Sequence, residues 1–301
     1  HQQKDYEQDG KLPEKHGEHG YQKAGMLAEH FGAIEGASID ANKGAYSSAW
    51  TIIFAVIAAI MVLIGIYHIK MLPSTQVPAT GKKTTSEIVT DLLNVIGNFF
   101  TKRHIVYYIF FIILYRLAEG FIMKVAPLFL RASREVGGLG LSLKEIGTLN
   151  GVFGSAAFVI GSLLGGIFVA RYGLKKTLFT LCCVFNLPFI AYTFLAVVQP
   201  TSLYLIGTCI TMEYFGYGFG FVGLTLFMMQ QIAPGKHQMS HYAFASGIMN
   251  LGVMLPGMIS GYFSDLLGYR SFFIYVLIAT IPAFLMTYFI PFTYDDSKKK
   301  K

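Results

Sequence analysis

Seven long apolar stretches alternate with polar segments along the chain. They cover roughly residues 45–69, 105–130, 142–169, 175–198, 202–232, 241–264 and 271–292. A helix needs about 20 apolar residues to cross a hydrocarbon core that is ~30 Å thick, and every stretch reaches that length. The pattern predicts an all-α membrane protein that begins with one transmembrane helix (45–70) and continues as a six-helix bundle (105–293).

The polar segments between and around these spans predict three further regions. Residues 1–44 form a soluble segment, and their four histidines sit in an acidic, irregular stretch that favours a solvated loop over a metal site. Residues 294–301 form a basic tail. The connector 71–104 repeats apolar residues at helical spacing, namely Ile88, Leu92, Val95, Ile96 and Phe99. We therefore expect an amphipathic helix on the membrane surface, with Lys82, Lys83, Lys102 and Arg103 facing lipid headgroups.

Composition supports a chain that lies mostly in lipid. Hydrophobic residues make up 53% of it and charged residues 14%, and its mean hydropathy is +0.51. The net charge of +7 comes from bases in loops between spans, which indicates membrane topology and argues against nucleic-acid binding. The three cysteines, Cys182, Cys183 and Cys209, fall inside spans and indicate neither disulfides nor a metal site.

The distribution of bases predicts the orientation of the chain. One side of the membrane receives thirteen bases in the connecting segments: Lys70, Lys82, Lys83, Lys102, Arg103, Arg171, Lys175, Lys176, Lys236 and Lys298 to Lys301. The other side receives five: Lys43, Arg131, Arg134, Lys144 and Arg270. Because cytoplasmic loops carry the excess of Lys and Arg, residues 1–44 are expected outside and the carboxyl terminus inside.

Glu213 stands alone as an acid in the apolar stretch from Leu203 to Gln230. An acid near the middle of a bilayer costs ~2.5 kcal/mol or more unless it meets a partner or water. Around it, Gly216 and Gly220 are four residues apart and allow close approach of a neighbouring helix. We expect a loosely wound helix here, because an open strand would leave unpaired edge groups in lipid.

Arg116 and Glu119 place two more charges inside a span, three residues apart on one helix face. Arg116 can grip an anionic carboxylate or phosphate, and Glu119 can take up and release a proton. The alternative is a permanent pair, Arg116 with Glu119 or with Glu213, that only neutralises itself. Our interpretation is that all three meet in one central cavity.

Small and polar residues inside the other spans predict helix contacts. Asn150, Asn186 and Asn250 must find hydrogen bonds, so each joins helices or contacts substrate. Glycine pairs at a spacing of four indicate close helix packing: Gly147 with Gly151, Gly161 with Gly165, and Gly257 with Gly261. The sequence has no nucleotide-binding loop, metal-ligand cluster or nucleophile triad, so we expect neither an enzyme nor a cofactor.

The order of one span, a basic connector and six spans is typical of the second half of a transporter with two six-helix halves. We therefore expect about five more spans upstream of His1. The segment from Gly166 to Lys176, GIFVARYGLKK, resembles the cytoplasmic signature of the major facilitator superfamily. Ala170 replaces the acid of that signature, which removes the family's usual charge latch at this loop.

A closer resemblance is carried by several short motifs. They are Arg116 to Gly120, Gly137 to Ser142, Glu213 to Phe221, and the pieces from His241 to Phe273 that include LPGM and GYRSFF. These resemble AmpG-type permeases, the branch of the superfamily whose named members import anhydromuropeptides, sugar-peptide products of cell-wall turnover. The resemblance covers about residues 45–293. We take Arg116, Glu119, Glu213, Tyr214, Asn150 and Asn250 as the candidate substrate-binding or coupling residues.

Two functions from different classes remain open at this point. The first is a proton-driven importer of an anionic sugar or peptide in the bacterial cytoplasmic membrane, whose partners are the substrate, protons, the lipid bilayer and a first half of the same transporter. The second is a membrane sensor or assembly scaffold with the same bundle. Three mid-membrane charges favour the transporter, because a scaffold has little reason to bear their cost.

Overall fold

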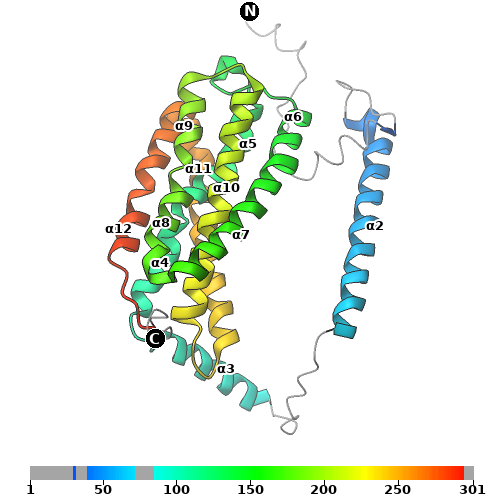
Figure 1. Cartoon of the computed structure of the whole chain (residues 1–301). Coiled ribbons are helices and arrows are strands. Elements are labelled where there is room, and N and C mark those ends of the chain that lie inside the picture. Colours follow the sequence, from blue (N-terminus) through cyan, green and yellow to red (C-terminus); the bar gives the residue numbers. More distant parts are fainter. Residues whose placement is uncertain (1–29, 32–38, 72–84, 295–301) are drawn as a thin grey trace, which may run out of the picture. The chain divides into compact units, whose positions relative to one another are not determined.

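A computed structural model describes residues 30–31, 39–71 and 85–294 (Figure 1). The chain divides into two compact units, His1–Pro73 and Ser74–Lys301. In the first unit, α2 (Ile39–Met71) is one helix of 33 residues, long enough to cross a bilayer. It starts six residues before the predicted span. Four ranges lie outside the described residues: 1–29 and 32–38 of the predicted segment 1–44, 72–84 with Lys82 and Lys83, and 295–301 in the basic tail.

The second unit is a helical bundle with one helix lying crosswise at its end (Figure 1). Its α-helices are α3 (Thr85–Phe100), α4 (Ile105–Tyr115), α5 (Leu117–Arg131), α6 (Leu143–Thr148), α7 (Ser155–Tyr172), α8 (Leu174–Asn186), α9 (Phe189–Val198), α10 (Leu203–Phe227), α11 (Gln238–Ala279) and α12 (Ile281–Tyr288). A short 3-10 helix, η1 (Arg134–Val136), and two π-helices, η2 (Leu149–Gly154) and η3 (Met228–Ile232), complete it.

Five stretches of the described residues are long and apolar enough to cross a membrane. They are Lys43–Met71, Ile105–Arg131, Leu143–Tyr172, Leu174–Val198 and Gln238–Tyr288. The helix α10, which carries Glu213, is not among these five stretches. The last stretch has 51 residues, and Gly268 divides it with φ 70° and ψ 158°, a conformation that glycine adopts without strain. If α10 is added, and the parts of the last stretch before and after Gly268 are counted separately, described helices cover the seven apolar stretches.

The glycine-rich part of α10 is regular α-helix, so the prediction of a loosely wound helix was wrong. The π turn lies beyond it, in η3. The glycines of α10 lie within the regular helix and allow the backbones of neighbouring helices to approach closely. A Cβ on Gly220 would lie 2.5 Å from the Leu181 carbonyl oxygen of α8, and one on Gly165 of α7 would lie 2.5 Å from the Phe219 carbonyl oxygen. Close packing at Gly216, Gly220, Gly161 and Gly165 is therefore confirmed.

Two other predicted glycine contacts are not found. A Cβ on Gly151 or on Gly261 would meet no heavy atom within 4 Å among the described residues. Gly257 faces α5, where an added Cβ would lie 3.4 Å from Lys124 Cγ and 3.5 Å from the Gly120 carbonyl oxygen, an ordinary contact distance. The spacing of four therefore marked tight backbone packing where α7 and α8 meet α10, whereas Gly151 and Gly261 lie on faces that no described helix covers.

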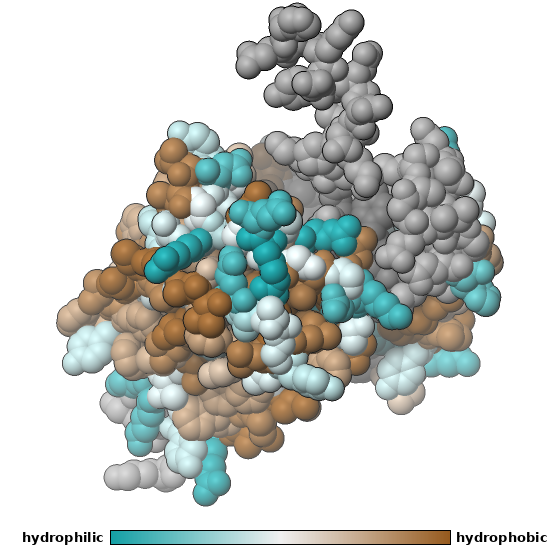
Figure 2. All heavy atoms as spheres, turned by 90° about the horizontal axis from the view of Figure 1, so that it is seen from above, coloured by the Kyte–Doolittle hydropathy of each residue, from teal (hydrophilic) through white to brown (hydrophobic). Residues whose placement is uncertain are grey.

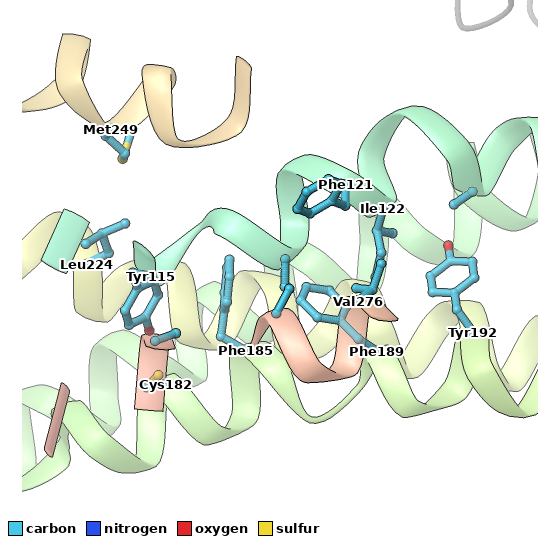
Figure 3. Packing of buried hydrophobic residues seen from close by; sticks show 14 of the residues in the cluster. Tyr115, Phe121, Ile122, Cys182, Phe185, Phe189, Tyr192, Leu224, Met249 and Val276 are labelled. Carbon is cyan, nitrogen blue, oxygen red and sulfur yellow. The ribbon is translucent and has the colours of Figure 1, made fainter. Parts of the chain in front are cut away.

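Aromatic side chains fill the space between α4, α5, α8, α10 and α11. Tyr115 and Phe185 lie with ring centroids 5.1 Å apart (Figure 3). Phe121 and Tyr275 lie with ring centroids 5.3 Å apart. Tyr115 is fully buried, and its hydroxyl donates to the Gly220 carbonyl at 3.0 Å. Seen from above, apolar residues cover the flanks of the bundle and hydrophilic residues gather at the near end (Figure 2). This distribution fits a bundle whose sides face lipid.

The predicted amphipathic helix forms as α3, and part of its surface packs on the bundle. Phe99 is buried and makes an edge contact with His241 of α11, while Val89, Leu92 and Leu93 are exposed. The expectation that Lys102 faces lipid headgroups was wrong. Its Nζ donates to the carbonyls of Ile232, at 2.5 Å, and Pro234, at 2.7 Å, and burial lowers the pKa of this ammonium. Its positive charge is held at the carboxyl end of η3, where helix dipoles favour cations.

Candidate substrate and coupling site

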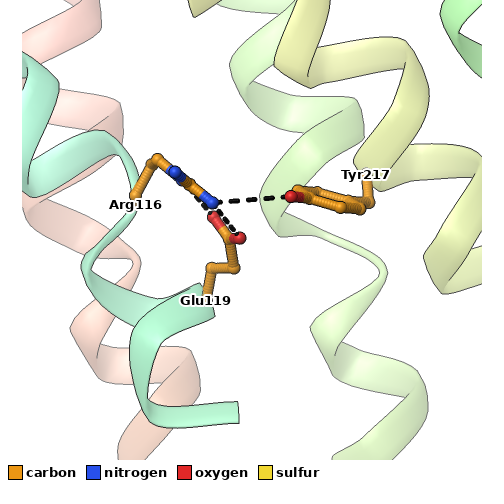
Figure 4. Close-up of polar contacts among 3 residues, drawn as sticks. All are labelled: Arg116, Glu119 and Tyr217. Atoms are coloured by element: carbon orange, nitrogen blue, oxygen red, sulfur yellow. Dashed lines mark hydrogen bonds and ion pairs between the residues drawn. The ribbon is translucent and has the colours of Figure 1, made fainter. Parts of the chain in front are cut away.

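Arg116 stands where the first span of the bundle breaks between α4 and α5. Its backbone, at φ −103° and ψ 5°, leaves the helical range and ends α4. From there its Nε donates to Oε2 of Glu119 at 2.6 Å, and its Nη2 donates to Oε1 at 2.5 Å (Figure 4). Both residues are 5% exposed. Of the two pairings that the sequence left open, the structure contains Arg116 with Glu119, in the two-point geometry that makes such pairs strong.

Tyr217 connects this ion pair to α10. Its hydroxyl accepts from Arg116 Nη2 at 3.4 Å (Figure 4). The Phe221 ring, one turn further along α10, lies 5.2 Å from Arg116 Cζ, within the range of a cation–π interaction. Tyr217 was not among the residues predicted from the sequence, although a signal was available. It lies four residues after Glu213 and therefore on the same helix face.

Glu213 is half-buried on α10. Within the described part of the chain it has no ion pair or hydrogen bond. Its carboxylate lies close enough to Glu119 for the two charges to interact, and Tyr217 is within electrostatic range of Glu213, Glu119 and Arg116. The three predicted charges therefore lie near one another, but only two of them are bonded.

The remaining predicted site residues are dispersed. The Tyr214 ring lies against Gly154 of η2, where an added Cβ would be 3.0 Å from it. Asn150 lies in the same π-helix, and its Oδ1 is buried without a partner among the described residues. Asn250 is exposed on α11, and no described contact joins it to the others. Asn186 is buried and donates to its own helix, to the Cys182 carbonyl at 3.0 Å.

Within the described residues, no group of three or more His, Cys, Asp or Glu side chains could hold a metal ion. The described site contains charged groups and hydroxyls. Its guanidinium can bind an anion, and its two carboxylates can bind protons. A multi-pass helical bundle with such groups inside it defines the class of membrane transport proteins.

Comparison with known proteins identifies the family within this class. The model of the Major Facilitator Superfamily matches residues 139–301, and the chain belongs to that family. The anhydromuropeptide permease of Escherichia coli K12 is 23% identical over 189 residues, which cover 63% of this chain and 37% of the permease. The predicted resemblance to AmpG-type permeases is thereby confirmed.

Two relatives from Rickettsia match more of the chain. The putative transporter AmpG 1 of Rickettsia bellii is 24% identical over 263 residues, covering 87% of this chain and 61% of the relative. The putative transporter AmpG 4 of Rickettsia conorii is 25% identical over 269 residues, covering 88% and 61%. The chain thus spans between 37% and 61% of the length of these relatives.

Proposed function

We propose that this chain is part of a secondary active transporter that imports an anionic, cell-wall-derived sugar or muropeptide together with protons. One observation carries the proposal. A buried Arg116–Glu119 pair contacts α10 through Tyr217, one turn from Glu213, which has no partner in the described residues. Placing charged side chains inside a membrane bundle is energetically costly, so their presence here favours a functional site.

The charges of the site support coupling between the anion and the proton. Arg116 and Glu119 neutralise each other, so the cluster has a net charge of −1 when Glu213 is ionised and zero when Glu213 is protonated. An anion that binds Arg116 is repelled by the first state and accepted by the second. By linkage, substrate binding and proton binding at Glu213 then strengthen each other, which is the requirement for symport.

The curated relatives are longer than this chain, and we propose that a first set of spans faces the bundle across the site. The two sets would rock about the bound substrate, with the break at Arg116 near the pivot. The thirteen-to-five bias of bases supports residues 1–44 outside and the carboxyl terminus inside the bacterial cytoplasmic membrane. Membership of a transporter family favours this function over a scaffold and over an enzyme.

Uptake by the protein of the complete gene, reconstituted in proteoliposomes, tests the proposal. Radiolabelled anhydromuropeptide is supplied outside at pH 6 with the lumen at pH 7.5, roughly a 30-fold proton gradient. We expect accumulation above equilibrium that a protonophore abolishes. Uptake that stops at equilibrium with or without the gradient would mean facilitated diffusion. Absence of uptake would remove the proposed substrate.

A further inference from the structure

The guanidinium of Arg116 has donors that the described protein does not use. An arginine carries five N–H donors. Nε and Nη2 supply the bonds to Glu119 and Tyr217, whereas the two N–H groups of Nη1 have no hydrogen bond within the described residues. The residue as a whole is only 5% exposed, and these unused donors are suited to a ligand oxygen.

Tyr217 is held more firmly than the side chain it contacts. Its ring lies 5.3 Å from Phe158 of α7, 5.6 Å from Phe185 of α8 and 5.6 Å from Phe221. The glycines on either side bring α10 against its neighbours: a Cβ on Gly218 would lie 3.0 Å from Phe158 Cα, and one on Gly216 would touch Pro188. The hydroxyl therefore has a fixed position relative to α7 and α8.

Arg116, in contrast, stands at a break between two helices and has a long side chain. Glu119 holds one edge of the guanidinium, and Tyr217 contacts Nη2 from the opposite helix. Together they fix the plane and the direction of the group. Without the Tyr217 hydroxyl, Glu119 and the face of the Phe221 ring would be left to orient it, and neither of them bonds the guanidinium from the side of α10.

We infer that Tyr217 is a positioning residue that turns the Arg116 guanidinium so that Nη1 binds a carboxylate of the substrate. The inference rests on the proposed function and adds what the site recognises, an anionic oxygen that accepts hydrogen bonds from the N–H groups of Nη1. Arg116 then selects the anion, and the uncharged hydroxyl of Tyr217 contributes to that selectivity by orienting the guanidinium.

Tyr217→Phe tests this role because the ring and its aromatic contacts remain and only the hydroxyl is lost. Tyr115→Phe is the matched control: Tyr115 also bonds α10 from α4, to the Gly220 carbonyl at 3.0 Å, and also packs on Phe185. Both variants lose one tyrosine hydroxyl between the same helices. Only the first loses it from Arg116.

The measurement is the KM for uptake of two probes in proteoliposomes, anhydromuropeptide and the same molecule with its carboxylates amidated. For Tyr217→Phe we expect the KM of the anionic probe to rise about fivefold, because a fivefold change corresponds to the free energy of one weak hydrogen bond to a charged group. The KM of the amidated probe and the maximal rate should stay unchanged. Tyr115→Phe is expected to change the two KM values equally or not at all.

If Tyr217→Phe changes the KM of both probes equally, Tyr217 has only a structural role and the inference is overturned. If it changes neither KM, the inference is overturned as well. If the wild type transports the amidated probe as well as the anionic one, Arg116 does not select an anion and the inference also falls. Wild-type protein that transports neither probe removes the proposed function and this role with it.

Discussion

Adjacent glycines on α7 give the packing of the bundle a quantitative test. At Gly165 an added Cβ would lie 2.5 Å from the Phe219 carbonyl oxygen and 3.1 Å from Phe219 Cα, while at Gly166 it would meet nothing within 4 Å. Alanine at 165 must push α7 and α10 apart, whereas alanine at 166 points into open space. The two substitutions differ by one residue and by nothing else in chemistry.

The magnitudes follow from two opposing effects. Gly→Ala inside a helix stabilises by about 1 kcal/mol, because the unfolded chain loses freedom. Overpacking against a backbone costs roughly 1–3 kcal/mol. We therefore predict that Gly166→Ala stabilises by up to about 1 kcal/mol and that Gly165→Ala destabilises by up to about 2 kcal/mol. The two variants differ by the overpacking cost of about 1–3 kcal/mol, which at roughly 3 °C per kcal/mol separates their melting temperatures by about 3–9 °C.

The assay is thermal unfolding of the purified variants in one detergent, followed by size-exclusion chromatography of the heated samples. A lower melting temperature for Gly165→Ala together with an equal or higher one for Gly166→Ala supports the contact between α7 and α10. Shifts of the same sign and size for both would refute it, since helix propensity alone would then explain them.

Two further outcomes are expected. Buried Gln231 accepts hydrogen bonds from the N–H groups of Thr293 and Tyr294 at 2.9 and 3.0 Å and donates one to the Tyr294 carbonyl at 2.7 Å. Gln231→Ala should therefore lower the free energy of unfolding by about 2 kcal/mol and make the chain near Thr293 and Tyr294 more sensitive to protease. Unchanged proteolysis would contradict this. Single cysteines at Lys15 and Lys83 should react with an impermeant thiol reagent in intact cells only at Lys15, and labelling at Lys83 alone would reverse the orientation.

The membrane made much of the fold predictable. Lipid admits only helices of sufficient length, so apolar stretches located the spans within a few residues. Charges inside such stretches are costly, and for this reason the sequence alone makes Arg116, Glu119 and Glu213 candidates for a functional site. The resemblance of short motifs to AmpG-type permeases came from the same spans.

Other features depend on contacts between distant parts of the chain. The spacing from Glu213 places Tyr217 on the same face of α10 as that acid, but only the contact with Arg116 distinguishes it from the other aromatic residues of the helix. The choice of Glu119 over Glu213 as the partner of Arg116 likewise depends on where the helix breaks. Lys102 looked like a headgroup contact because the end of η3, which it binds, is 130 residues away along the chain.

Coupling at Glu213 is tested most directly by comparing accumulation with exchange in Glu213→Gln, using Glu135→Gln, an exposed acid of η1, as the control. The glutamine keeps the size of the side chain but cannot lose or gain the proton. We predict that Glu213→Gln loses gradient-driven accumulation of anhydromuropeptide and retains exchange of internal for external substrate, while Glu135→Gln keeps both. Accumulation by Glu213→Gln against the substrate gradient, at the wild-type ratio, would contradict the assignment of Glu213 as the coupling acid.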